Sequence, residues 1–414
     1  MVNWFSSLLS HRLKKNRWRK HLYVKKKIDL AVKNTKYSKA DLERQFQGWS
    51  AFVCDSSPSI QLKEIYPLLI DFLRKGNDTK LRYSYLIDKI KILEVTNLDS
   101  DILHQLYRVF LSYGFFSVGL SLRKKGVEAK LLLNEGSVLD SIPFILEEGN
   151  LLSNIDVLDL FKTKKISDNK IKMVIWLSNI FSSGVCADRC RFVSDADKEF
   201  YSYIKDKRIA IVGPITSDVQ QGYEIDSFDL VLRFNFKNEM NDYNKKIYGE
   251  RTSLSYYSIV HTKALKDQDY TLVFNLIDYV CFVKEKSRSF FDKDKFKNRV
   301  SYDYRWLLPD TEFNIGVNAI FDLLRFNPSE IKVFNTDLML TAGRNKNYWP
   351  SSVGNVDYIR SFIKTHDPVT QYQFLSHVYR SGLIKGDEQF CEVMEMGLDK
   401  YISKLQLAHG KQFT

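Results

Sequence analysis

The sequence predicts an α/β fold in which a parallel sheet follows a mainly helical N-terminal region. Short apolar, β-branched runs that are typical of buried strands are concentrated after about residue 200. Before that point, apolar residues recur at spacings of three and four, as on one face of a helix. With 414 residues, 44% of them apolar, the chain can bury a sizeable core. We expect three parts: a basic segment over 1–27, a helical domain over 28–200 and a sheet-containing domain over 201–414.

The first 27 residues combine apolar and basic side chains. Trp4, Phe5, Leu8 and Leu9 precede a dense run of Lys, Arg and His that reaches Lys27. This combination is typical of a basic amphipathic helix that docks on an anionic membrane surface. A solvated basic arm and a nucleic-acid-binding patch stay open as alternatives, because a run of positive charge specifies little else. No run approaches the roughly 20 apolar residues of a membrane span, so we expect a cytoplasmic protein held peripherally on the inner face of the membrane.

Charge and cysteine content narrow the possible partners and the redox setting. The chain has 62 basic and 50 acidic residues, a formal charge of +12 that favours anionic partners. Its five cysteines are scattered and odd in number, which indicates reduced thiols and no disulfide framework. Cys186 and Cys190 lie one helical turn apart, but without a nearby His or further Cys they make a poor metal site.

The region 28–200 shows the spacing of amphipathic helices. The clearest helical windows are 41–44, 65–74 and 102–113. Residues 173–181 indicate a later apolar helix, and the cluster 194–197 is expected to cap the helix after it. The run 164–170 is polar and contains Lys, Ser, Asp and Asn, so it is a candidate linker. We therefore expect helices that pack against the sheet-containing domain.

The stretch from Arg208 to Arg251 contains two strands that each end in residues suited to a ligand. Residues 208–212 are β-branched and apolar, and Gly213-Pro214 ends them in a sharp turn. Residues 229–234 form a second apolar run that finishes on Arg233 and Asn235, a cation and an amide. Parallel sheets bind ligands at the carboxyl ends of their strands. An ordinary strand–helix–strand unit without a ligand stays equally open, because a single glycine turn is a weak signal.

Further strands and a polar segment follow in the second half of the chain. The runs 252–258, 279–284 and 331–337 have the composition of strands, and 317–326 that of a helix opened by Asn314 and Gly316. The segment from Glu285 to Asn298 is rich in Lys, Asp, Ser and Phe, and we expect a mobile loop or exposed helix that could cover a site as a lid.

Three blocks resemble the sialylmotifs of sialyltransferases. EIDSFD (224–229), LVLRFN (230–235) and GERT (249–252) are similar in order and spacing to the large sialylmotif. NIGVNAIFDLL (314–324) followed by IKVFN (331–335) is similar to the small sialylmotif, and HDPVTQ (366–371) resembles the short His motif near the family's C-terminus. The resemblance covers roughly residues 205–385. Three blocks in the family's order are far more specific than any one of them.

The chain also departs from the family pattern at positions near the expected donor. Pro214 stands where the family has Asn, Phe228 where it has His, and Gln371 where it has Glu; NIG at 314–316 replaces the family's Ser-Thr-Gly. Each change removes or exchanges a polar group. The resemblance therefore implies a class of donor, a CMP-activated 3-deoxy ulosonic acid, and leaves open whether this is 3-deoxy-manno-octulosonate (Kdo) or a sialic acid.

The resemblance implies a fold and an activity. It implies a Rossmann-like glycosyltransferase, GT-B-like or of the sialyltransferase-like variant, that transfers its sugar to a bacterial surface glycan of lipopolysaccharide or capsule. The acceptor can be lipid-linked, and neither a metal nor a cofactor is expected. A basic nucleic-acid-binding protein and a catalytically inactive scaffold of the same fold are the alternatives, although we expect no nucleic-acid partner.

The resemblance and the strand ends also select site residues. The expected donor-binding residues follow strands or open the helix of the small motif: Gly213, Pro214, Arg233, Asn235, Asn314 and Gly316. His366 is the expected base that takes the proton from the acceptor hydroxyl, and His261 is the second candidate. If the enzyme instead retains configuration through a covalent adduct, a carboxylate must be the nucleophile, with Asp229 the first choice and Asp337 the second.

Overall fold

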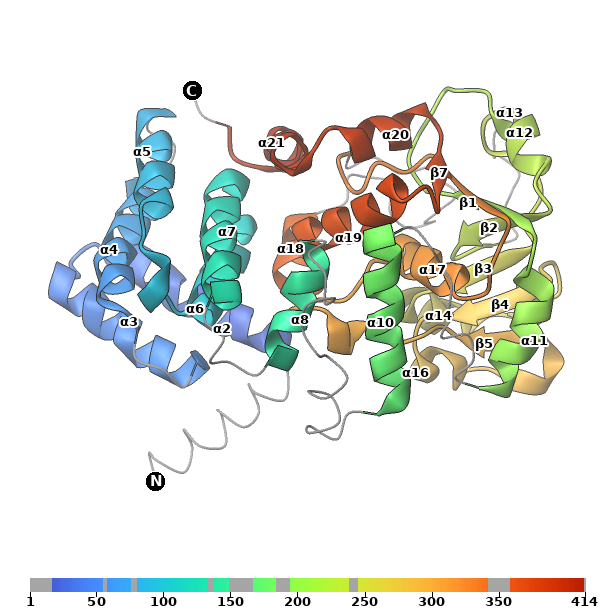
Figure 1. The fold of residues 1–414 in the computed structure, drawn as a ribbon, viewed down its shortest axis with the longest axis horizontal. Coiled ribbons are helices and arrows are strands. Elements are labelled where there is room, and N and C mark those ends of the chain that lie inside the picture. Colours follow the sequence, from blue (N-terminus) through green and yellow to red (C-terminus); the bar gives the residue numbers. More distant parts are fainter. Residues whose placement is uncertain are drawn as a thin grey trace.

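The computed structural model describes most of the chain, in the ranges 17–54, 58–75, 80–132, 138–148, 167–183, 194–237, 245–341 and 358–412. Its centre is a seven-stranded sheet in the order β5-β4-β3-β2-β1-β6-β7, and every neighbouring pair is parallel. Figure 1 shows this sheet at one end of the molecule and the first helices of the chain at the other. The predicted α/β, Rossmann-like class is confirmed.

The strands are short, and the inner ones are buried on both faces. Their bounds are β1 (Arg208–Val212), β2 (Leu230–Phe234), β3 (Leu254–Tyr257), β4 (Tyr279–Phe282), β5 (Asn298–Val300), β6 (Glu330–Phe334) and β7 (Lys385–Gly386). Burial on both faces explains why β1 to β4 are nearly continuous apolar runs in the sequence. The five predicted strands are confirmed within a few residues. The edge strands β5 and β7 have no apolar run that would predict them.

The predicted helical region is confirmed within the described residues. Its helices are α2 (Arg17–Lys33), α3 (Lys39–Cys54), α4 (Ile60–Lys75), α5 (Lys80–Lys91), α6 (Ser100–Ser112), α7 (Phe116–Leu132), α8 (Val138–Glu147) and α10 (Asp168–Ser183), with a short turn η1 (Val95–Asn97). Helix α6 is buried along most of its length and packs closely against α7. A side chain at Gly126 would press on Leu103 and on the carbonyl oxygen of Ser100, so this glycine allows the close packing of the two helices.

Helix α2 crosses the boundary that we expected after Lys27. His21, Val24 and Ile28 on this helix are buried, and the helix packs on α4, α6 and α18 (Tyr358–Lys364). Its described part therefore belongs to the helical region, and not to a separate docking segment. Trp4, Phe5, Leu8 and Leu9 lie outside the described residues, as do Cys186 and Cys190. Within the described ranges, no helix combines the length and the apolar character needed to cross a bilayer.

Helix α11 (Asp195–Ile204) begins where the sequence predicts and belongs to the sheet layer. Ser194 caps it by accepting a hydrogen bond from the backbone N–H of Asp197. The Asp197 carboxylate is buried and forms ion pairs with Arg299, which lies on β5, and Arg325. The sheet-containing part thus starts about seven residues before the expected boundary at 201.

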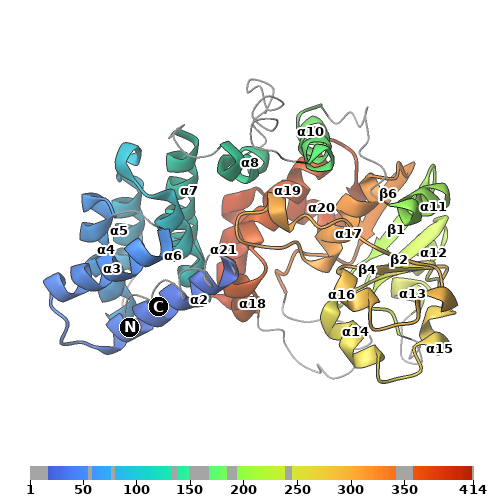
Figure 2. The same cartoon turned by 90° about the horizontal axis from the view of Figure 1, so that it is seen from below.

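The remaining helices connect the strands or follow them. They are α12 (Gly222–Asp226), α13 (Lys245–Tyr248), α14 (Ile259–Leu265), α15 (Thr271–Phe274), α16 (Glu285–Arg288), α17 (Ile315–Leu324), α18 (Tyr358–Lys364), α19 (Pro368–Arg380), α20 (Glu388–Glu395) and α21 (Leu398–His409), with the turns η3 (Lys293–Lys295) and η4 (Arg305–Leu307). Seen from below, α18 and α21 lie between the first helices and the sheet (Figure 2).

The helical and sheet-containing parts share one hydrophobic core. A single cluster of buried side chains runs from Val24 on α2 to Leu405 on α21 and includes the inner strands. Phe116 on α7 meets Phe362 on α18 edge to face, with ring centroids 5.8 Å apart. The two parts are therefore joined by continuous packing.

The segment between Glu285 and Asn298, expected to be a loop or an exposed helix, forms α16 and η3, and most of its residues are exposed. Phe291 is an exception: it packs against Phe274 and Phe282 with ring centroids 5.1 and 5.6 Å away, in the aromatic cluster beside β4. No residue of the segment lines the pocket described below, so its expected role as a lid has no support in this arrangement.

Candidate functional site

A pocket of about 460 Å³ lies at the carboxyl ends of β1, β2, β3, β4 and β6. The strand order reverses at β1, because the chain runs outward from β1 to β5 and then returns to place β6 on the other side of β1. Parallel α/β sheets bind their ligands in the crevice at such a switch point. Seven of the predicted site residues line this pocket, namely Pro214, Asn235, His261, Asn314, Gly316, Asp337 and His366.

Asn235 links the ends of β2 and β3. Its backbone is left-handed, with φ of 53°, which asparagine tolerates better than most residues. The side-chain oxygen accepts a hydrogen bond of 2.9 Å from the backbone N–H of Ser258, and the Ser258 hydroxyl lies 2.9 Å from Nδ1 of His261. The two polar residues predicted after separate strands are thus joined through one serine.

Asn314 and Gly316 open helix α17 at the pocket. The Asn314 side chain accepts a bond of 2.9 Å from the N–H of Val317 and caps the helix. A side chain at Gly316 would come no closer than 3.4 Å to any neighbour, so the wall there is open. The N-terminus of this ten-residue helix favours negative charge in the pocket, because its first N–H groups and its dipole point toward that end.

His366 lies between α18 and α19, with its imidazole anchored by the backbone. Its Nδ1 is 3.0 Å from the carbonyl oxygen of Glu312. A carbonyl only accepts, so Nδ1 holds the proton of the neutral ring and Nε2 keeps its lone pair. Burial lowers the pKa of His366, and the charges of Arg108 and Lys284 lower it further against the opposing effect of Glu312. The ring is therefore neutral at pH 7, as a general base requires.

Gln371 holds the loop that carries this carbonyl. Its side-chain oxygen accepts a bond of 2.9 Å from the N–H of Asn314, and its Nε2 donates a bond of 3.0 Å to the oxygen of Glu312. A glutamate, which the resembled motif has at this position, would lack the donor for the second bond. The departure noted in the sequence thus has a structural reason in this chain.

Arg233 lies at the expected strand but faces the other side of the sheet. Side chains alternate along a strand, so Arg233 points opposite to Phe234, which lines the pocket. Its guanidinium donates to the carbonyl oxygen of Tyr248 at 2.7 Å and to the Thr252 hydroxyl at 3.0 Å. This arginine holds the loop before β3 and does not line the pocket.

Asp229 lies at the opposite end of β2 from the pocket. Its carboxylate is exposed and accepts a bond of 2.7 Å from the backbone N–H of Arg208. The position suits a residue that sets the register of β1 and β2, and it offers no contact with the pocket. Asp337, the second carboxylate considered, does line the pocket and accepts a bond of 2.7 Å from the N–H of Thr341.

Gly213 serves the packing of two loops. Its N–H donates to the carbonyl oxygen of Phe334 at 2.8 Å, and a side chain here would collide with the Thr336 hydroxyl and the Asn335 carbonyl oxygen. The glycine lets the loops after β1 and β6 touch. Gly213 does not line the pocket itself. Its role is to allow the close packing of the two loops at the switch point.

Two charged pocket residues were missed in the sequence. Lys284 follows β4 and forms an ion pair of 2.8 Å with Glu312, and both side chains are about one quarter exposed. Lys284 could have been predicted, because a lysine at the carboxyl end of a predicted strand is a usable signal of a binding residue. Glu312 left no signal in the sequence, because it lies in the loop before the helix cap and its role depends on the fold. Within the described ranges, the pocket holds no group of three metal-ligating side chains close enough to share an ion.

Comparisons with known proteins returned no match, either among protein-family models or among curated proteins. The motif blocks and the geometry of the pocket are therefore the grounds on which a function can be proposed.

Proposed function

We propose that this protein is a glycosyltransferase that transfers a 3-deoxy ulosonic acid, Kdo or a sialic acid, from its CMP-activated donor. The acceptor is a bacterial surface glycan of lipopolysaccharide or capsule, and the fold is the sialyltransferase-like variant of the Rossmann-like class. One observation carries the proposal. Residues of all three resembled blocks, Asn235, Asn314 and His366 among them, line a single pocket at the switch point although they are up to about 130 positions apart.

The pocket has groups that suit an anionic donor. The N-terminus of α17 favours the phosphate of CMP, and Lys284 supplies a cation for that phosphate or for the carboxylate of the ulosonic acid. Glu312 balances the lysine when no ligand is bound. This arrangement would bind the charge of the donor with fixed protein groups, in keeping with the metal-independent reaction that the resemblance implies.

His366 acts as the base in the proposed reaction. As the acceptor hydroxyl oxygen bonds to the anomeric carbon, its proton passes to Nε2, and the bond between the anomeric carbon and the phosphate oxygen breaks to release CMP. This single displacement inverts the configuration at the anomeric carbon. A covalent route through Asp229 has no support, since that carboxylate lies at the other end of β2.

The cellular setting is part of the same proposal. The basic N-terminal residues would hold the protein on the cytoplasmic face of the membrane, where a lipid-linked acceptor is accessible.

Nucleotide binding tests the proposal first. CMP should raise the melting temperature, while UDP and GDP should leave it nearly unchanged. Incubation with CMP-Kdo and with a CMP-sialic acid, followed by mass spectrometry of the products, would then identify the sugar. Equal stabilisation by all three nucleotides, together with no transfer from either donor, would contradict the proposal.

A further inference from the structure

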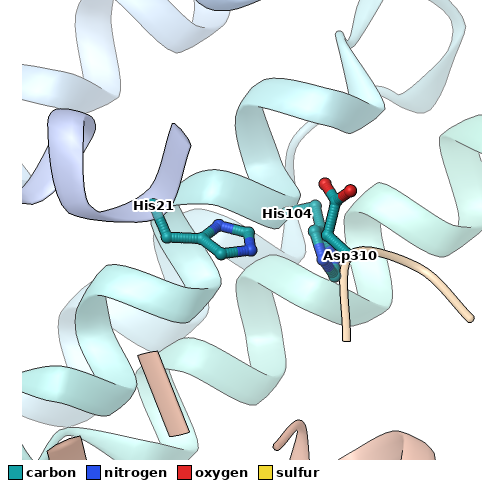
Figure 3. Close-up of side chains that lie close together, drawn as sticks. All are labelled: His21, His104 and Asp310. Carbon is teal, nitrogen blue, oxygen red and sulfur yellow. The ribbon is translucent and has the colours of Figure 1, made fainter. Parts of the chain in front are cut away.

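A cluster of metal-ligating side chains lies outside the pocket, where the helical region meets the loop before α17. His21 comes from α2, His104 from α6 and Asp310 from the loop that leads to the helix cap. One ligand atom from each residue lies within 4.8 Å of the other two. Figure 3 shows the three side chains converging from three separate ribbons.

The two histidines are buried, and their ring nitrogens are poorly satisfied by hydrogen bonds. His21 is 0% and His104 6% exposed. The Gln105 side chain and the backbone of Asp310 lie near His21, and the backbone of Pro309 lies near His104, but none of the four ring nitrogens makes a well-aligned hydrogen bond with a described group. Buried polar atoms usually have well-formed partners, so poorly satisfied nitrogens beside a carboxylate are consistent with a bound species.

The three side chains offer the donor atoms that a transition metal needs. Each imidazole has a ring nitrogen that can serve as a ligand, and one such nitrogen of each histidine lies within 4.8 Å of the other ligand atoms. Asp310 supplies a carboxylate oxygen beside them.

We infer that His21, His104 and Asp310 form a structural site for a divalent transition-metal ion, with zinc the first candidate. Two imidazole nitrogens and one carboxylate oxygen are ligands that zinc prefers, and water can complete the tetrahedron. Zinc bond lengths place tetrahedral ligands about 3.3 Å apart, so small side-chain rotations suffice to close the cluster. Calcium and magnesium prefer all-oxygen sites, whereas two buried imidazoles and one partly buried carboxylate suit the four-coordinate sites of zinc.

The ion would fasten the helical region to the wall of the pocket. Asp310 is two residues before Glu312, whose carbonyl oxygen holds both His366 and Gln371. His21 and His104 belong to two helices that pack against each other. Zinc at this point would therefore fix the loop that positions the imidazole, and it would contribute to folding stability apart from any reaction.

A buried anion is the competing occupant. Arg108 has side-chain nitrogens, Nε and Nη2, that also lack partners among the described residues. The Asp310 carboxylate disfavours an anion, because an anion bound at the cluster would lie within a few ångströms of another negative charge. Arg108 also faces Asp367 at 3.5 Å, which already balances part of its charge.

Metal analysis and thermal unfolding of the full chain test the inference. The purified protein should contain about one zinc per chain, removal with a chelator should lower the melting temperature, and added zinc chloride should restore it. Asp310→Asn should abolish this zinc-dependent shift. Asparagine keeps the size of the side chain and suits the left-handed backbone at this position, where φ is 54°, so the variant should fold.

Asp206→Asn is the matched control, because Asp206 has φ of 60° and lies at the surface; it should bind zinc as the natural chain does. The inference is overturned if the protein holds no zinc and gains no stability from it, or if Asp310→Asn responds to zinc like the control. Stabilisation by inorganic phosphate but not by zinc would assign the cluster to an anion. All these results are independent of nucleotide binding, so the proposed function and the metal site can fail separately.

Discussion

The bond between His366 Nδ1 and the Glu312 carbonyl oxygen fixes the tautomer that the proposed reaction needs. His366→Ala should therefore lower kcat by roughly 10² to 10⁴, the usual contribution of a general base. The affinity for CMP should change little, because the residue would meet the acceptor hydroxyl. Steady-state kinetics and CMP titration check both parts.

His377→Ala is the control for this substitution. His377 also bonds a backbone carbonyl oxygen, that of Glu147, at 2.6 Å, but it does not line the pocket. Near-normal turnover in His366→Ala, or an equal loss in both variants, would remove the base from the proposed mechanism.

The pH dependence of the reaction should follow the charge beside His366. Activity needs the neutral ring, so kcat/KM should fall as the pH drops through a pKa below 6.5, the direction that burial gives. Lys284 contributes to lowering this pKa and also pairs with Glu312. Lys284→Met removes a positive charge and leaves Glu312 unbalanced, and both effects raise the pKa of His366. The acid limb of the profile should therefore move to higher pH.

Lys284→Arg keeps the charge and should leave the acid limb in place. This distinguishes the electrostatic effect from a loss of donor binding, which would raise KM without moving the limb. A limb that stays fixed in Lys284→Met would show that another group titrates.

At the scale of elements, Gln371 on α19 holds the loop before α17 through a single buried amide. Gln371→Glu restores the residue of the resembled motif but removes the donor to the Glu312 oxygen and buries a charge. We expect a loss of about 1–3 kcal/mol in unfolding free energy, the usual cost of an unsatisfied buried group. Denaturant unfolding measures it.

Gln61, near the surface, also uses its side-chain amide for one donated and one accepted hydrogen bond: it donates to the carbonyl oxygen of Glu94 and accepts from the N–H of Glu94. Gln61→Glu should cost less than Gln371→Glu, because water can solvate the new carboxylate. Equal losses in the two variants would mean that burial of the Gln371 amide does not matter.

The elements that carry the site were largely predictable, and the orientation of their side chains was less so. Strand ends and a helix cap can be recognised from local patterns, which is why Asn235 and Asn314 were selected; His366 was selected from the resemblance to the short His motif. The side of the sheet that Arg233 faces follows from the alternation along β2, but only once the pocket is known to lie on the side of Phe234.

Other features depend on residues far apart in the sequence and left no local signal. The edge strands β5 and β7 pair through a few residues without an apolar run. The Glu312 carbonyl, its two partners and the convergence of His21 with His104 arise only when α2, α6 and α19 are packed. Such contacts have long sequence separations, so periodicity and composition carry no information about them.

At the scale of the whole molecule, the helical region supports the pocket through buried charge. Asp367 follows the proposed base and accepts a bond of 2.5 Å from the Tyr107 hydroxyl on α6. It also pairs with Arg108 and Arg123, on α6 and α7. Removal of one partner of such a network leaves an uncompensated buried charge. The helices therefore hold the connection between α18 and α19 in place, which agrees with the expectation that the helical region packs against the sheet-containing domain.

The same packing decides how the N-terminal segment can be tested. Deletion of residues 1–16 removes Trp4, Phe5, Leu8 and Leu9 with part of the basic run, and it leaves α2 intact. This variant should no longer sediment with anionic vesicles, while its melting temperature and its turnover of a soluble acceptor stay close to those of the full chain. Deletion of residues 1–27 also removes His21 and Val24, both fully buried, so its melting temperature should fall. If the shorter deletion still sediments like the full chain, the surface that meets the membrane lies elsewhere, because the apolar residues proposed to dock are then absent.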